Sequence, residues 1–187
     1  MTTGRRPGGY LPGMPMKKTV LTYGLISGAV SSLMMLGTIP FMHRIGFEHG
    51  LVVGYTAIVL SFLLVSFGIR SYREQAGGAI TFGRAFTVGI LITLISCVFY
   101  VATWQLIYFK LQPGFMDKWE AYAVEKVRAD GGTPERVEAT RRQMRSFKQT
   151  YDNPLTNAAY TFIEPFPVGL LVTVISAAAL RRKPRPA

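Results

Sequence analysis

The sequence predicts an all-α fold: an integral membrane bundle of four transmembrane helices, with an extramembrane helical hairpin between helices 3 and 4. Hydrophobic residues make up 49% of the 187 residues and charged residues only 17%, a balance typical of membrane proteins. Three long segments contain no Asp, Glu, Lys, Arg or His, and a fourth contains a single acid. The apolar content excludes a disordered chain, and a single cysteine excludes a disulfide scaffold or a multi-cysteine metal site.

The four apolar segments define the expected spans, at about residues 19–39, 51–69, 85–109 and 158–180. A bilayer core requires about 20 helical residues, and each segment is of that order. Backbone groups in hydrocarbon must be satisfied internally, and no segment alternates like a barrel strand, so the spans should be helices. They belong to a single four-span membrane domain over residues 16–183. A disordered cytoplasmic tail over residues 1–15 and a basic tail over 184–187 flank this domain.

The charges of the connections predict the orientation. Both chain ends and the connection at residues 70–84 together hold 11 Lys and Arg against one acid, whereas residues 40–50 and 110–157 hold 10 against eight. Lys and Arg are enriched on the cytoplasmic side, so both termini are expected to be cytoplasmic. The net charge of +11 is thereby explained without a nucleic-acid partner. Besides the lipid bilayer itself, anionic lipid is a possible partner at Arg181, Arg182 and Lys183.

The connection at residues 110–157 predicts an outer helical hairpin over residues 113–152. Gly131 and Gly132 separate its two helices, and Thr133 and Pro134 are a typical N-cap and first residue for the second. Apolar residues recur at helical spacing in both helices: Met116, Trp119, Ala123 and Val127, then Val137, Thr140, Met144, Phe147 and Tyr151. The opposite side of the second helix is expected to carry Arg141, Arg142, Arg145 and Lys148. The favoured interpretation is that the stripes pack on each other or among lipid headgroups; the alternative is a docking surface or a lid over a cavity.

Small residues recur every four positions within the spans and are predicted to pack helices closely: Gly24, Gly28, Ser32, Gly89 and Gly169 are the clearest. Packing within one chain is the favoured interpretation, and a homodimer face at Gly24 and Gly28 is the alternative. Residues 81–98 also match residues 161–178 at nine of 18 positions. Consecutive spans enter the membrane from opposite faces, so this match suggests an inverted repeat.

Glu164 is the one ionisable residue inside a span and is therefore the candidate functional residue. It lies toward the outer end of its span and is followed by Pro165, which favours a capping role or a pairing with a basic residue of the hairpin. His43, Glu48 and His49 are too few to predict a metal site. Cys97, in an apolar setting, is expected to be a packing residue. The sequence shows no nucleophile with a base and no cofactor motif, so we expect no catalytic, cofactor or metal site and no enzyme.

Several motifs resemble a known family: MKKTVLTYGLISGAV from Met16, YREQAGGAITFGRAFTVG from Tyr72, LQPGF and YDNPL around the hairpin, and FPVGLLVTVISAAALRRK from Phe166. They are similar to the bacterial four-span membrane proteins grouped as domain-of-unknown-function family 4199. The resemblance supports the four-span topology, implies a place in a bacterial inner (plasma) membrane, and implies no activity. The leading hypothesis is a non-enzymatic accessory or interaction protein, with a protein partner or a homodimer. The alternative is a small transporter or channel-like subunit acting as an oligomer.

Overall fold

The computed structural model describes residues 16–182, without the side chains of residues 42–45, 48 and 51. The predicted tails at 1–15 and 184–187 lie outside the described residues. The described chain is helical, in the order α1 (Met16–Thr38), the short turn η1 (Ile39–Phe41), α2 (Met42–Gln75), α3 (Phe82–Leu106), the wide π-helical turn η2 (Ile107–Leu111), α4 (Phe115–Ala129), α5 (Pro134–Tyr151), α6 (Pro154–Ile163) and α7 (Phe166–Leu180).

Four segments of the described chain are long and apolar enough to cross a membrane: 16–41, 52–75, 82–111 and 154–180. Each of these segments contains the corresponding apolar segment predicted from the sequence. The one exception is Leu51, because the second segment begins at residue 52. A water-soluble protein would not expose such surfaces: the side chains of Leu33, Val98 and Leu171 are 69%, 62% and 59% exposed on the outside of the bundle. Exposed apolar side chains of this kind are stable in contact with lipid. The chain is therefore a multi-pass membrane protein.

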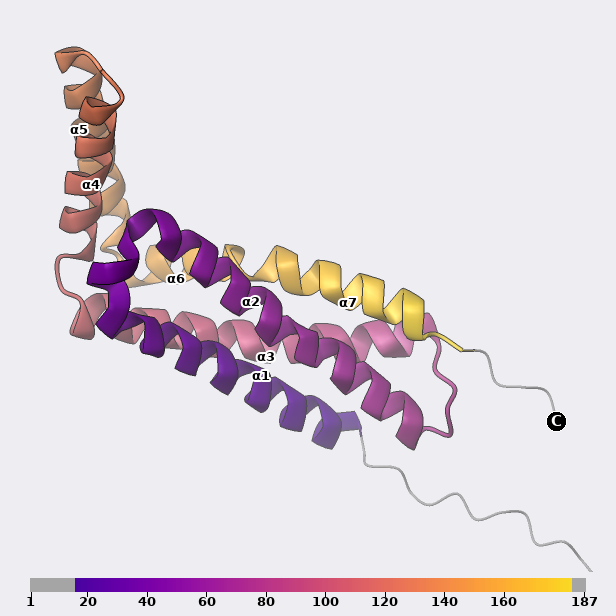
Figure 1. The fold of residues 1–187 in the computed structure, drawn as a ribbon. Helices are drawn as coiled ribbons and strands as arrows, with labels where there is room; N and C mark the ends of the chain where they lie inside the picture. The colour runs from indigo at the N-terminus through magenta and orange to yellow at the C-terminus, as the bar shows by residue number, and fades with distance from the viewer. Residues whose placement is uncertain (1–15, 183–187) are drawn as a thin grey trace, which may run out of the picture.

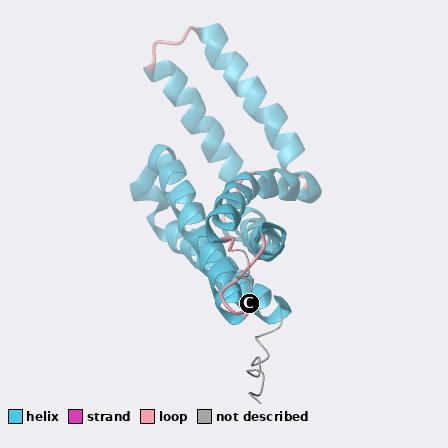
Figure 2. Cartoon of the chain, turned by 90° about the vertical axis from the view of Figure 1, so that its right-hand side faces the viewer, coloured by secondary structure: helices cyan, strands magenta, loops and turns pink. Residues whose placement is uncertain are grey.

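The long helices run side by side, and the hairpin stands at one end of them. Figure 1 shows α1, α2, α3 and α6–α7 lying lengthwise, with α4 and α5 rising steeply from the end opposite to the start of α1 and the end of α7. In Figure 2 the two hairpin helices lie next to each other above the bundle. At the other end, backbone hydrogen bonds join Ile80 to Arg182 and tie the connection between α2 and α3 to the end of α7. Four passes thus bring the chain back to the side where it began.

Two helix boundaries differ from the apolar segments. α2 begins at Met42 rather than near residue 51, with a kink at Gly46, whose φ is 68°. Hydropathy identifies only the part of a helix that lies in lipid. The polar residues at the start of α2 therefore did not count toward the predicted span. The fourth span is broken into α6 and α7 around Glu164 and Pro165, because proline lacks the N–H that a continuous helix requires.

The core combines apolar and small hydroxyl side chains. Val65, Ile69, Val88 and Ile92 are fully or almost fully buried, as are Ser27, Thr93 and Thr173. The hydroxyls bond to neighbouring helices: Ser27 donates to the carbonyl of Ser61 at 2.9 Å, and the hydroxyls of Ser66 and Ser176 lie 2.6 Å apart. Lipid is as apolar as the buried side chains, so the hydrophobic effect contributes little to helix association inside a membrane. Hydrogen bonds of this kind therefore help to hold the helices together.

Candidate functional site

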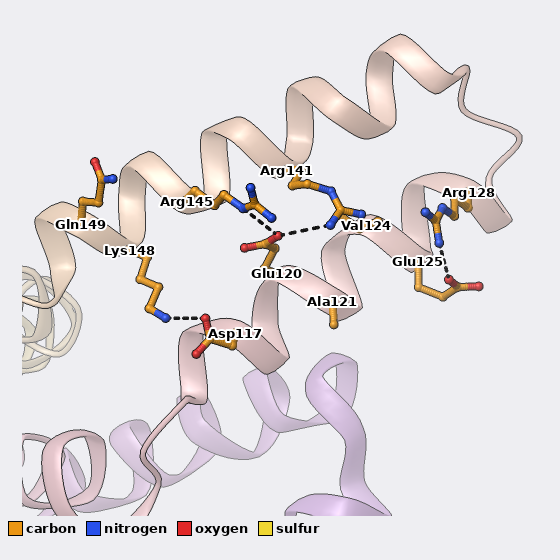
Figure 3. A pocket seen from close by; sticks show the side chains of 10 residues that line it. All are labelled: Asp117, Glu120, Ala121, Val124, Glu125, Arg128, Arg141, Arg145, Lys148 and Gln149. Atoms are coloured by element: carbon orange, nitrogen blue, oxygen red, sulfur yellow. Dashed lines mark hydrogen bonds and ion pairs between the residues drawn. The ribbon is translucent and has the colours of Figure 1, made fainter.

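Ion pairs join the two helices of the hairpin along one edge. Glu120 of α4 lies 3.4 Å from the guanidinium of Arg145 and 3.9 Å from that of Arg141, both on α5. Its side chain is only 16% exposed. Lys148 donates a hydrogen bond to Asp117, and this bond raises the pKa of Lys148 above its ordinary value. Figure 3 shows these side chains facing one another across the groove between α4 and α5.

This arrangement corrects the predicted basic side of α5. The sequence placed Arg141, Arg145 and Lys148 opposite to the apolar stripe, whereas the structure turns all three toward the acids of α4. Arg142 lies 4.0 Å from Glu138, four positions before it on α5. Arg141 and Lys148 follow Val137 and Met144 by four positions, so they border the apolar stripe and can reach α4 beside it.

The other edge of the hairpin carries a shallow apolar hollow. Trp119 of α4, Met144 and Phe147 of α5, and Tyr160 of α6 line it, together with Gln143, Ser146 and Thr150. The Phe147 ring lies 5.6 Å from the Tyr160 ring, edge to face. We call this set of residues the hairpin hollow. Its aromatic side chains are partly exposed, because α5 packs against α4 and α6 and no further described helix covers it.

Hydrogen bonds from α3 and η2 fix the base of the hairpin. The indole of Trp104 donates to the Tyr151 hydroxyl at 2.9 Å, and the Tyr108 hydroxyl donates to Asp152 at 2.5 Å. Burial raises the pKa of the Tyr151 phenol above its ordinary value. Asn153 caps α6 by accepting from the backbone N–H groups of Leu155 and Thr156. The corner between α5 and α6 is therefore held by specific polar contacts with the bundle, which the sequence patterns did not indicate.

A cavity of about 200 Å³ lies where the bundle meets the hairpin. We call it the junction cavity. Helices α1, α2 and α3 form its walls, and Phe115, Trp119 and Tyr151 of the hairpin region line it as well. Its described lining residues are Ser31, Met34, Met35, Thr38, Gly46, Phe47, Gly50, Val53, Gly54, Ala57, Ile58, Tyr100, Trp104, Phe115, Trp119, Tyr151 and Glu164. Trp119 and Tyr151, which belong to the predicted apolar stripes of the hairpin, thus lie against a cavity. Met116 and Val124 of α4 are buried.

Glu164 lies in the wall of the junction cavity. It stands at the break between α6 and α7, where Pro165 follows it. Its carboxylate accepts a hydrogen bond from the Tyr100 hydroxyl of α3 at 3.1 Å. The described hydrogen-bond partner is thus a phenol of the bundle. A basic residue of the hairpin, one of the two roles that the sequence analysis left open, is not this partner.

The predicted small residues lie at close helix contacts. An added Cβ at Gly24 would lie 2.9 Å from Ile95 Cβ, and one at Gly28 would lie 2.6 Å from Phe99 Cγ. One turn further along, the Thr103 hydroxyl donates to Ser32 at 2.7 Å. The row Gly24, Gly28 and Ser32 therefore faces α3 of the same chain.

The two matching segments of the sequence pack against each other. Gly89 and Gly169 are equivalent in the alignment, as are Thr93 and Thr173. A Cβ at Gly89 would meet Thr173, and a Cβ at Gly169 would meet Thr93. The hydroxyl oxygens of Thr93 and Thr173 lie 3.1 Å apart. These reciprocal contacts between antiparallel helices give the pair a local two-fold arrangement, as an inverted repeat would.

The remaining candidates are dispersed. Cys97 is fully buried in the core. The side chains of His43 and Glu48 lie outside the described residues, and the described part of the chain contains no cluster of three metal-ligating side chains. Arg181 and Arg182 are exposed at the end of α7, and Lys183 lies outside the described residues.

Comparison with known proteins supports the family resemblance. A family model described as "Protein of unknown function (DUF4199)" matches residues 22–182. No curated protein and no solved structure matches the chain. The family match covers the described bundle, the hairpin and the junction cavity. The chain therefore belongs to domain-of-unknown-function family 4199.

Proposed function

We propose that this protein is a non-enzymatic accessory protein of the bacterial inner membrane that binds a protein partner through its hairpin. In this proposal both chain ends are cytoplasmic and the hairpin lies on the outer side, following the charges of the connections. The observation that carries the proposal is the hairpin hollow, an apolar surface at the end of the bundle opposite to the start of α1 and the end of α7.

The residues of the hollow are of the types that dominate protein interfaces. Trp119, Phe147, Tyr160 and Met144 offer large apolar surfaces, and such residues are enriched in interface cores. The ion pairs of Glu120 and the hydrogen bonds of Tyr151 hold the surrounding helices in place before any partner arrives. A surface that is already ordered loses less conformational entropy on binding.

The centre of the bundle favours this function over transport. Thr93 and Thr173 lie in direct contact there, and Gly169 brings α7 against Thr93 and Phe62. This close packing fills the space between α3 and α7. A transporter would require a polar path at that depth, supplied by another subunit or by another conformation.

Site-specific photocrosslinking in native membranes tests the proposal. Gln143 borders the hollow and Gln149 borders the ion-paired groove, and both are exposed residues of α5. A benzophenone amino acid at position 143 should give a discrete adduct with one other protein, and the same group at 149 should not. Phe147→Ala should reduce the adduct at 143.

Two outcomes contradict the proposal. Equal adducts at positions 143 and 149 would show that the hollow has no special role. An adduct at 143 with a second copy of this chain, and with nothing else, would make the hollow a homodimer contact and not an accessory surface.

A further inference from the structure

We propose that the junction cavity binds an alkylated ammonium group, with the Glu164 carboxylate as its counter-ion. This inference goes beyond the proposed function, because it does not depend on whether the hairpin hollow binds a protein. It rests on three properties of the cavity: its aromatic walls, the single acid among its described lining residues, and its size.

The walls of the cavity are rich in aromatic rings. Its described lining includes Phe47, Tyr100, Trp104, Phe115, Trp119 and Tyr151. The face of an aromatic ring attracts a cation, and cages of such rings recognise substituted ammonium groups. The rings are also held in place: Phe47 lies 5.2 Å from Trp119, and Trp104 lies 5.2 Å from Phe115, each edge to face.

The charge of the lining selects a cation. Glu164 is its one acidic residue, and the described lining contains no Lys, Arg or His. A carboxylate at an apolar site inside a membrane segment is unfavourable unless an opposite charge or several hydrogen bonds compensate it. Among the described residues, Tyr100 supplies one hydrogen bond, and no cationic side chain there forms an ion pair with Glu164. A bound ammonium group would supply the missing charge.

The volume limits what the cavity admits. About 200 Å³ is smaller than a typical site for a drug-sized molecule, so the cavity accommodates an ammonium group with its first apolar substituents and not an entire lipid. Such a group can come from the headgroup of a membrane lipid or from a free amine. The chemistry of recognition is the same for both sources.

Tryptophan fluorescence of the full-length protein in lipid nanodiscs provides the test. The chain has two tryptophans, and both Trp104 and Trp119 line the cavity. Choline is the cationic probe, and 3,3-dimethylbutanol is its uncharged counterpart of the same shape. In phosphatidylglycerol discs, choline should change the emission saturably, and the alcohol should bind at least about tenfold more weakly.

Two variants assign the effect to Glu164. Glu164→Gln should weaken choline binding by about tenfold or more, since it removes the charge and keeps the shape. Glu74→Gln is the matched control, because Glu74 is an exposed acid near the opposite end of the bundle, paired with Arg70 at 2.9 Å. It should leave choline binding unchanged. Replacing half of the lipid with phosphatidylethanolamine should weaken choline binding more than replacing half with an uncharged glycolipid if a lipid ammonium headgroup occupies the cavity, and equally if the natural ligand is a free amine.

The proposal is overturned if choline does not bind the wild type, or if the alcohol binds as well as choline. It is also overturned if Glu164→Gln binds choline as the wild type does. Should Glu164→Gln fail to fold, the comparison of choline with 3,3-dimethylbutanol on the wild type still decides the matter.

Discussion

Gly28→Ala tests the contact between α1 and α3 with a single methyl group. The added Cβ would lie 2.6 Å from Phe99 Cγ, 2.8 Å from Phe99 Cβ and 2.9 Å from Phe99 Cδ2. Carbon atoms in favourable contact lie about 3.5–4.0 Å apart, so the helices must separate or Phe99 must move with its backbone. Overpacking of this kind costs about 1–3 kcal/mol of unfolding free energy.

Gly37→Ala is the matched control on the same helix. A Cβ at Gly37 meets nothing within 4 Å, so only the helix propensity changes, by up to about 1 kcal/mol in favour of the variant. We expect Gly28→Ala to be less stable than Gly37→Ala by about 1–3 kcal/mol. Unfolding by sodium dodecyl sulfate in mixed micelles, followed by tryptophan fluorescence, measures the difference.

Equal stability of the two variants would refute the close approach of α1 to α3. A second result would refute its placement within one chain: a Gly28→Ala monomer of unchanged stability that no longer forms a crosslinked dimer. In that case Gly24 and Gly28 would form the homodimer face.

Three further predictions concern topology, the α3–α7 contact and the hairpin. An alkaline phosphatase fusion at Gly131 should be active and one at Lys183 inactive, and the reverse would overturn the proposed orientation. Thr93→Val should lower the unfolding free energy by about 1–3 kcal/mol, because it leaves the buried Thr173 hydroxyl without its partner at 3.1 Å; no loss in the same unfolding assay would argue against that bond. Glu120→Gln should speed amide hydrogen exchange in α5, measured by mass spectrometry, since it weakens the pairing with Arg141 and Arg145. The exposed Glu125→Gln is its control, and equal exchange in both would refute a role for the Glu120 pairs.

The sequence by itself determined the class of fold and the division into spans and hairpin. Long apolar segments report directly on transfer into lipid, a property of each segment alone. The start of α5 was equally local: Thr133 accepts from the Arg136 N–H at 3.4 Å, and Pro134 follows it, as the predicted cap requires. The break of the fourth span at Glu164 and Pro165 has a local cause as well, since proline cannot donate to the preceding turn.

The tertiary structure alone decided which residues meet. Tyr100 reaches Glu164 across 64 positions of sequence, and nothing in either segment marks the other as its partner. Glu120 and Asp117 of α4 meet Arg145 and Lys148 of α5, and this pairing depends on how the two helices are rotated against each other. The junction cavity arises only when α1, α2, α3 and the hairpin converge on one point. Hydropathy, periodicity and capping are set by residues within a few turns of each other, whereas a cavity and its charge depend on the packing of distant segments.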